Sequence, residues 1–335
     1  MRNMKKIIAI VAGGDSSEHD VSMRSAAGIW SFLDKELFEP YIIEIKGTNW
    51  EALLPNNRRT PINRHDFSFE NNGRRLTPHF AYITIHGTPG ENGILQGYLD
   101  LLRIPYSTSG VLTEAMSFNK FCLNNYLKAF GVKVADSVLI NQHNLHQVKS
   151  SEVISHIGLP CFVKPNEGGS SFGITKVKTE QDLLPALTKA LHESNTAIVE
   201  SYLEGTEVTV GCYKTNTKQV ILPITEIITN NEFFDYDAKY NGQVTEITPA
   251  RIPPSLTQRL NTLTSTIYDI LNCSGIVRAD YILTHQTNNT LINLLELNTT
   301  PGMTPTSFIP QQVNAAGMTM TNVLNDIISN KINIK

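Results

Sequence analysis

The chain has 335 residues, a formal net charge of −3 and 18% charged residues. This length allows two or three domains with cores of their own, and the charge balance excludes a broad basic surface for nucleic acid. No apolar run reaches the roughly 18 residues of a membrane helix, and the run Ile7–Val11 is too short for a signal peptide. The sequence has neither a CxxC pair nor an HxxxH or HxH cluster, which argues against zinc. We therefore predict a cytoplasmic protein with reduced, buried thiols at Cys122, Cys161, Cys212 and Cys273.

The first part of the chain predicts a small parallel α/β domain, residues 1–108, because strand and helix patterns alternate. After the first strand, Gly13-Gly14 leads into a helix for which Ser16 or Ser17 is the expected N-cap. The polar residues 48–79 predict an irregular insertion. Expected strands are Lys5–Val11, Phe38–Ile45, Phe80–Ile85 and Ile104–Tyr106, and expected helices end near Leu33 and span Asn92–Leu102.

The glycines after the first strand are also typical of nucleotide-binding folds. However, no GxGxxG is present, and no acidic residue ends the second strand in the way that a dinucleotide site requires. The sequence therefore argues against a nicotinamide oxidoreductase.

A glycine-rich loop interrupts two expected strands within Leu159–Lys178. Lys164 precedes the glycines and the chain returns as a hairpin, whereas a Walker loop passes from strand to helix and ends in Gly-Lys-Ser/Thr. A plain hairpin turn needs only two to five residues. The longer loop favours phosphate binding by the backbone N–H groups of Gly168–Ser171, with the loop closing as a lid.

The remaining pattern predicts further strands and helices, with one segment open to two interpretations. FFDYDAKY, residues 233–240, fits either a strand edge with packed aromatic rings or a mobile lid that brings Lys239 and Tyr240 to a substrate. Glu207 is a charged residue in an otherwise apolar run. Expected helices are Ser117–Phe130, which carries Lys120, Asn144–His156, Leu256–Leu271 and Gln311–Ile328, and expected strands are Ala135–Ile140, Ala197–Ser201, Glu207–Tyr213 and Ile221–Ile228.

Two later strands each carry a pair of polar residues at positions i and i+2, which point to the same face of a strand. Arg278 and Asp280 form the first pair, and Glu296 and Asn298 the second. Carboxylate and amide oxygens suit Mg²⁺ or Mn²⁺. One such strand would indicate a polar edge with a solvent-facing salt bridge, but two strands followed by the bend Pro301-Gly302 favour a metal site.

Six motifs in this order resemble the ATP-grasp ligases and, within them, the D-alanine–D-alanine ligase family, over residues 7–328. They are GGDSSEHDVS (13–22), HGTPGENG (86–93), VKPNEGGSSFG (163–173), FFDYDAKY (233–240), VRAD (277–280) and LELNTTPGMTPTS (295–307).

The resemblance implies an α/β protein with a three-domain ATP-grasp fold. The N-terminal parallel α/β domain (1–108) would be followed by two α+β domains (109–199 and 200–335) that sandwich ATP. It also implies ATP-dependent ligation of two D-alanines through an acyl phosphate, for peptidoglycan precursors, in a homodimer.

The resemblance further implies a role for each matching residue. Glu18 would hold the ammonium of the first D-alanine and His86 its carboxylate, and Ser170 and Tyr240 would bond to Glu18 to lock the lid. Arg278 and the N–H of Gly302 would form an oxyanion hole, and Ser307 and Phe308 would hold the second D-alanine. ATP would contact Lys120, Lys164, Gly169, Ser170, Ser171, Glu200, Ser201, Tyr202, Leu203, Glu207 and Lys239, and two Mg²⁺ or Mn²⁺ ions would bind Asp280, Glu296 and Asn298.

Five residues at three places depart from what many family members carry, and none removes a catalytic group. Phe118-Asn119 stands where Met-Asp is frequent, Asn166-Glu167 where Ser-Arg is frequent, and Ser201 where a lysine is common. Two rival interpretations remain: a ligase that uses D-lactate or D-serine as acceptor, and an inert ATP-binding protein on the same fold. The FFDYDAKY loop argues against the first, and the complete set of metal ligands with Arg278 argues against the second.

Overall fold

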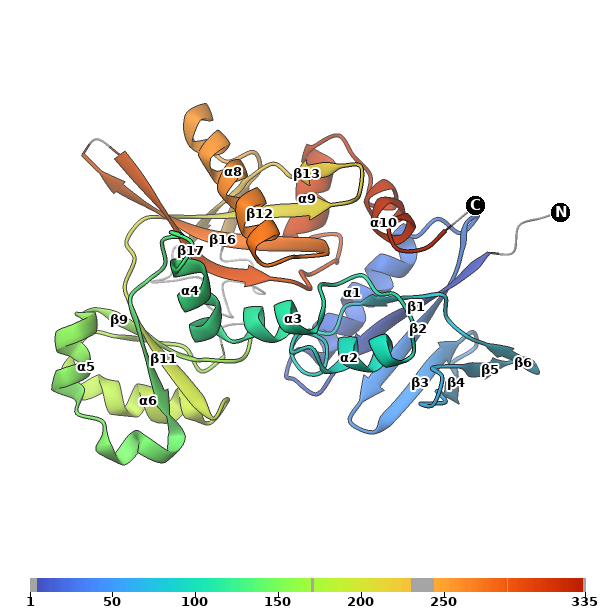
Figure 1. The fold of residues 1–335 in the computed structure, drawn as a ribbon, viewed down its shortest axis with the longest axis horizontal. Helices are drawn as coiled ribbons and strands as arrows, with labels where there is room; N and C mark the ends of the chain where they lie inside the picture. The colour runs from blue at the N-terminus through green and yellow to red at the C-terminus, as the bar shows by residue number, and fades with distance from the viewer. Residues whose placement is uncertain (1–4, 170–171, 230–243, 288, 334–335) are drawn as a thin grey trace.

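The structure is a computed structural model that describes residues 5–169, 172–229, 244–287 and 289–333. Three principal sheets of five, four and six strands form three lobes (Figure 1). The helices α3 (Val111–Phe118) and α4 (Lys120–Lys128) run between the lobes. Within the described part of the chain, no helix is long and apolar enough to cross a membrane.

The first sheet is mixed rather than purely parallel, with strand order β4-β3-β2-β1-β7. β1 pairs in parallel with both of its neighbours and is almost wholly buried, which explains its continuous apolar run. β3 and β4 then add an antiparallel edge. The strands are β1 (Lys6–Gly13), β2 (Phe38–Lys46), β3 (Asn49–Leu54), β4 (Arg58–Pro61) and β7 (Phe80–Ile83).

The prediction of an irregular insertion at residues 48–79 was wrong, because these residues form β3, β4 and the small hairpin β5 (Phe69–Asn71) and β6 (Arg74–Leu76). Some of the Asn, Arg and Pro residues that suggested an insertion lie within strands, such as Arg58 and Pro61 in β4, and others make the turns. Asn56 and Asn57 have φ of 61° and 56°, and Asn72-Gly73 has 51° and 74°. Asparagine and glycine tolerate this left-handed conformation, which tight hairpins require.

Two helices of this lobe, α1 (His19–Phe32) and α2 (Ile94–Leu101), lie near their expected positions. The predicted serine N-cap was wrong: Glu18 occupies the N-cap and makes no side-chain cap hydrogen bond. The hydroxyl of Ser16 instead donates to the carbonyl of His86 at 2.7 Å. The expected strand at 104–106 is reduced to one bridge between Ala81 and Tyr106.

The predicted helix 117–130 is interrupted at Asn119, which is extended and caps α4 by accepting a hydrogen bond from the N–H of Cys122. Lys120 is therefore the first residue of α4, next to the loop that follows β9. Cys122 is exposed, contrary to the prediction, whereas Cys161, Cys212 and Cys273 are buried.

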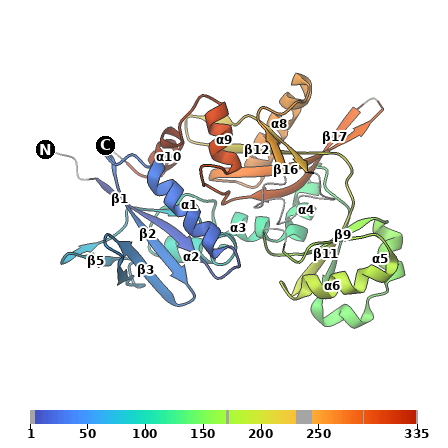
Figure 2. The same ribbon diagram turned by 180° about the vertical axis from the view of Figure 1, so that it is seen from behind.

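The second sheet is antiparallel, in the order β10-β9-β11-β8, and has a separate core beneath α5 and α6 (Figure 1 and Figure 2). The expected helix 144–156 divides into a 3₁₀ segment (Gln142–Gln147) and α5 (Ser150–Ile157). The remaining elements are β8 (Ser137–Asn141), β9 (Cys161–Pro165), β10 (Thr175–Val177), α6 (Leu183–Leu191) and β11 (Thr196–Ser201).

The third sheet is also antiparallel, in the order β15-β14-β12-β16-β17, with β13 beside β12. The expected helix 311–328 is two helices, because Gly317 has a φ of 68° and ends the first. The elements are β12 (Thr206–Lys214), β13 (Gln219–Ile221), β14 (Thr225–Thr229), β15 (Val244–Ile247), α8 (Pro254–Ile270), β16 (Gly275–Gln286), β17 (Asn289–Asn298), α9 (Phe308–Ala315) and α10 (Met320–Ser329).

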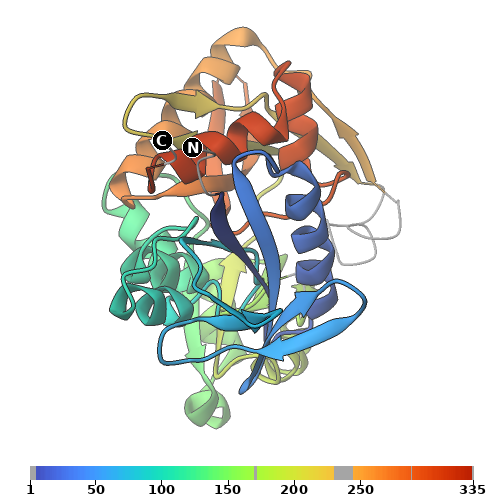
Figure 3. The same cartoon turned by 90° about the vertical axis from the view of Figure 1, so that its right-hand side faces the viewer.

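One hydrophobic core joins the two ends of the chain. Ile8 and Ile29 of the first lobe belong to the same buried cluster as Val323 and Ile327 of α10. Figure 3 shows the blue helix α1 beside the red helices α9 and α10. The first and third lobes therefore form one packed unit, whereas the four-stranded sheet keeps its own core.

Gly275 permits the close contact between β16 and the segment that leads into α3. Its φ is +71°, and an added Cβ would lie 1.7 Å from the carbonyl oxygen of Ser107.

Gly275→Ala should therefore lower the free energy of unfolding by about 2–4 kcal/mol, measured in urea. Gly131→Ala is the matched control, because its φ is +81° but nothing lies within 4 Å of the added Cβ. It should cost only about 1 kcal/mol, and equal losses in both variants would contradict the contact argument.

Candidate active site

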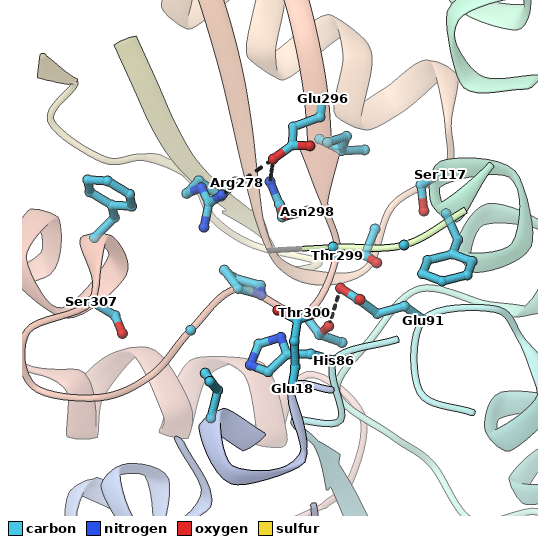
Figure 4. A pocket seen from close by; sticks show the side chains of 18 of the residues that line it. Glu18, His86, Glu91, Ser117, Arg278, Glu296, Asn298, Thr299, Thr300 and Ser307 are labelled. Carbon is cyan, nitrogen blue, oxygen red and sulfur yellow. Dashed lines mark hydrogen bonds and ion pairs between the residues drawn. The ribbon is translucent and has the colours of Figure 1, made fainter. Parts of the chain in front are cut away.

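A cleft of about 580 Å³ lies where the three lobes meet. The first lobe contributes Glu18 and His86, the linker contributes Lys120, and the glycine-rich loop contributes Gly169. The third lobe lines the other side (Figure 4). The predicted site residues that line this cleft are Glu18, His86, Lys120, Gly169, Arg278, Glu296, Asn298, Gly302, Ser307 and Phe308.

The polar pairs of β16 and β17 come together as the strand pattern predicts. In the antiparallel register Asp280 faces Glu296 and Arg278 faces Asn298. The guanidinium of Arg278 donates to both Asp280 oxygens, at 2.9 and 2.7 Å. Thr209 donates to Asp280 Oδ1 at 2.5 Å and Asn298 to Oδ2 at 3.1 Å.

This arrangement differs from a solvent-facing salt bridge at a sheet edge. Although β17 is the edge strand, the side chains of Arg278 and Asp280 are only 14% and 7% exposed. Burial acts to lower the pKa of Arg278, but the charge and hydrogen bonds of Asp280 outweigh it and raise the pKa. Glu296 is more open, at 32%, and its Oε1 lies 4.0 Å from the Arg278 guanidinium. The described residues contain no group of three His, Cys, Asp or Glu side chains placed to hold a metal.

The two lysines expected to bind phosphate are half-buried beside the glycine-rich loop. Lys120 donates to the carbonyl of Gly168 at 2.7 Å, and burial lowers its pKa. Lys164 lies 2.7 Å from Glu200, which also accepts a hydrogen bond from Asn124 at 2.9 Å. Burial acts to lower the pKa of Lys164, but Glu200 and the other nearby carboxylates raise it above the ordinary value.

The other residues expected near adenine and ribose continue from Glu200 into the next strand. Ser201 exchanges backbone and side-chain hydrogen bonds with Asp136, so its local role is structural. Lys176 Nζ lies over the ring of Tyr202, 4.1 Å from its centroid. Glu207 on β12 faces Ile227 and Ile282, and its charge raises the pKa of Lys164 and Arg278. Tyr202, Leu203 and Glu207 are not among the residues that line the cleft.

Glu18 and the glycine-rich loop meet across the cleft. A Cβ on Gly169 would lie 2.5 Å from Glu18 Oε2, so glycine is needed there. His86 is buried, and among the described residues its Nε2 has no hydrogen-bond partner. A buried polar atom of this kind indicates a ligand or water site. The predicted residues Ser170, Ser171, Lys239 and Tyr240 lie outside the residues that the structure describes.

The turn after β17 brings the predicted acceptor residues together. A Cβ on Gly302 would lie 2.9 Å from the hydroxyl of Ser307, which shows how closely the two approach. Ser307 is the N-cap of α9, and its hydroxyl also meets that of Thr304 at 2.7 Å. Arg278 Cζ lies over the ring of Phe308, 5.4 Å from its centroid.

Two glutamates without a predicted role hold this turn, the half-buried Glu91 and the buried Glu114. Glu91 accepts a hydrogen bond from Thr300 at 2.5 Å (Figure 4). It also accepts one from the N–H of Gly87 at 2.7 Å. Glu114 of α3 accepts from Thr299 at 2.6 Å and from the N–H of Ser109 at 2.9 Å. Glu91 stands inside the HGTPGENG motif, so the motif could have indicated it. A single glutamate in a helix, such as Glu114, gives no sequence signal of burial.

Comparison with known proteins gives matches along the whole chain. The family described as "D-ala D-ala ligase N-terminus" matches residues 7–109, and "D-ala D-ala ligase C-terminus" matches residues 126–329. The chain is 59% identical to the D-alanine–D-alanine ligase of Phocaeicola vulgatus over 98% of this chain and 100% of the relative. It is 49% identical to that of Porphyromonas gingivalis, over 98% of both chains.

Solved structures share the fold over the same length. The D-Ala:D-Ser ligase VanG from Enterococcus faecalis has a TM-score of 0.85 at 28% identity, covering 98% of this chain and 100% of that one. The D-alanyl-alanine synthetase A of Vibrio cholerae has a TM-score of 0.85 at 27% identity, covering 99% of both chains. The D-alanine–D-alanine ligase of Bacillus anthracis complexed with ATP has a TM-score of 0.75 at 26% identity, covering 97% of both chains.

The buried carboxyl of Glu114 makes stability depend on pH. Burial raises its pKa well above the ordinary 4.5. The folded protein therefore binds this proton more tightly than the unfolded chain, and the free energy of unfolding should fall as pH rises from 4.5 towards the raised pKa. Glu114→Gln lacks this contribution, so its stability relative to the natural protein should increase with pH. Urea unfolding between about pH 5 and about pH 8 measures the difference, and a difference independent of pH would contradict the prediction.

Proposed function

The chain belongs to the D-alanine–D-alanine ligase family of ATP-grasp enzymes, and we infer from this membership that it joins two D-alanines at the expense of ATP, for peptidoglycan precursor synthesis. The observation that carries this function is the cleft, in which groups for a first amino acid, a nucleotide and a second amino acid converge. We propose that ATP first phosphorylates the carboxylate of one D-alanine. The ammonium of the second D-alanine loses a proton to solvent, and the free amine then attacks the acyl phosphate. The amide forms, and phosphate leaves and takes up the second proton of the nitrogen.

The first D-alanine binds between Glu18 and His86 in this proposal. Glu18 receives its ammonium, and His86 contacts its carboxylate. The Nε2 of the buried His86, which has no partner among the residues that the structure describes, supports this assignment, because the substrate carboxylate supplies the missing acceptor. Ser170 and Tyr240 would complete the lock on Glu18, and both lie outside the described residues.

ATP binds between the four-stranded sheet and the third lobe. Lys120 and Lys164 neutralise its phosphates, and the backbone at Gly169 lies over them. Phosphoryl transfer depends mostly on positioning and charge neutralisation, which these two half-buried lysines supply. The base and ribose would contact Glu200, Ser201, Tyr202, Leu203 and Glu207, and Ser171 and Lys239 would add contacts from beyond the described residues.

The residues Asp280, Glu296 and Asn298 fit two Mg²⁺ or Mn²⁺ ions. All three carry oxygen donors on adjacent strands, and hard divalent cations prefer such donors. When bound, these ions would neutralise charge on the phosphates. Arg278 shares Asp280 with this set, so the guanidinium lies beside the developing negative charge.

Arg278 and the N–H of Gly302 stabilise the oxyanion that forms when the amine attacks. The acceptor carboxylate binds at Ser307 and Phe308, where the N-terminus of α9 favours a negative charge. Closing the cleft would exclude water, which otherwise hydrolyses the acyl phosphate. We assign the donor site to residues 1–108, the glycine-rich lid to residues 109–199, and the metal and acceptor sites to residues 200–335, with ATP between the last two.

The experiment is release of phosphate from ATP by the purified protein with D-alanine. Release should require both D-alanine and a divalent cation, and D-alanyl-D-alanine should form in equal amount. D-serine and D-lactate as added acceptors test the rival specificity, which the fold match to a D-Ala:D-Ser ligase makes worth measuring. Phosphate release that ignores D-alanine would overturn the proposal.

Arg278→Ala in the same assay should lower ligation about 10²–10³-fold while ATP binding is retained, because one oxyanion donor is lost. Arg278→Lys keeps a positive charge beside Asp280 and controls for loss of the fold. Near-normal turnover in Arg278→Ala would contradict the assignment of Arg278 to the oxyanion hole.

We also propose a homodimer formed through α2 and α3. Ile94 and Leu101 lie seven residues apart on one face of α2 and are 60% and 86% exposed. Leu112 on the neighbouring α3 is 73% exposed (Figure 1). Adjacent exposed apolar side chains of this size are typical of an interface.

Leu101→Lys combined with Leu112→Lys should therefore convert a dimer to a monomer, measured by light scattering after size exclusion. Leu184→Lys is the control, since this 41% exposed leucine lies on α6 in another lobe. A natural protein that is monomeric, or a double variant that remains dimeric, would refute this interface.

A further inference from the structure

Glu246 of β15 is an acidic residue of the cleft that none of the roles above uses. It lines the cleft together with Arg278, Ser307 and Phe308. Its Oε2 accepts a hydrogen bond from Gln311 Nε2 at 2.6 Å, so the carboxylate is held on the acceptor side of the cleft. Although the residue is exposed at the mouth of the cleft, partial burial of the carboxyl raises its pKa, while Gln311 and the charge of Arg278 act to lower it.

The partner of Glu246 fixes its position relative to the acceptor site. Gln311 lies in the first turn of α9, and its Nε2 also donates to the carbonyl of Thr306 at 2.7 Å. Its backbone N–H donates to the carbonyl of Ser307 at 3.2 Å. The Gln311 amide therefore ties Glu246 to the same segment that carries the proposed carboxylate site of the acceptor.

The other acidic residues that line the cleft are already engaged. Both oxygens of Glu91 accept hydrogen bonds, from Gly87 and Thr300. Glu18 packs closely against Gly169, on the side of the cleft proposed for the first D-alanine. Glu296 accepts a hydrogen bond from Asn298. Within the part of the chain that the structure describes, Glu246 Oε1 accepts no hydrogen bond.

We propose that Glu246 binds the ammonium group of the acceptor amino acid. The acceptor enters as a zwitterion, so its ammonium needs a negative partner close to the carboxylate site. Glu246 supplies this charge from β15, and Gln311 leaves Oε1 available for the ligand. The proposal rests on the ligase function, and it makes Glu246 a residue that favours an amino acid over a hydroxy acid as the second substrate.

The test uses two acceptors that compete for one acyl phosphate. D-Alanine carries an ammonium, whereas hydroxylamine is uncharged at neutral pH and yields D-alanyl hydroxamate. In Glu246→Gln, the ratio of dipeptide to hydroxamate at fixed concentrations should fall about fivefold or more. This ratio is set after the acyl phosphate forms, so it does not depend on how much of the variant is folded.

Two further variants serve as controls. Glu246→Asp keeps the charge and should restore much of the ratio. Glu152→Gln removes the same charge from an exposed site on α5, far from the cleft, and should leave the ratio unchanged.

The result distinguishes this inference from the ligase function. If the natural protein makes neither product, the ligase function itself fails. If the natural protein makes both and Glu246→Gln leaves their ratio unchanged, the assignment of Glu246 is overturned. A fall of the same size in Glu152→Gln also overturns it, because the effect would then follow net charge and not position.

Discussion

The carboxylate of Asp280 is the point on which the rest of the site depends. It is buried, and it accepts hydrogen bonds from Arg278, Thr209 and Asn298, which lie on three adjacent strands. A buried charge with this many partners fixes the side chains around it, because removing one partner leaves the charge poorly compensated. The guanidinium of Arg278 and the amide of Asn298 are thereby held in place before any ligand arrives.

The turn that follows β17 is held in place by residues from other parts of the molecule. Glu91 comes from the first lobe and Glu114 from the linker, and each holds one of the two consecutive threonines. The segment that leads to Gly302 and Ser307 is therefore positioned by groups far away in the sequence. In the proposed reaction, donors that are already held in place would need no reorganisation.

The sequence predicted the local patterns well and the long-range contacts poorly. Alternation on two strands correctly placed Arg278, Asp280, Glu296 and Asn298 on one face, because a strand's side-chain direction follows from its period of two. Periodicity missed the helix breaks at Asn119 and Gly317, where one cap or one positive φ decides. It also gave no sign of Glu114, whose partner Thr299 lies far along the chain and whose burial depends on tertiary packing.

The core shared by the first lobe and the last helix has a consequence for biosynthesis. The apolar face of β1, with Ile8 and Ile10, is covered partly by Val323 and Ile327 near the end of the chain. A ribosome makes these covering residues after the strands of all three sheets, so the apolar face of the nascent first lobe stays exposed while the other sheets are made. Such surfaces are prone to aggregate during folding. Protection by a chaperone would matter more for this lobe than for the four-stranded sheet, whose core closes from neighbouring segments.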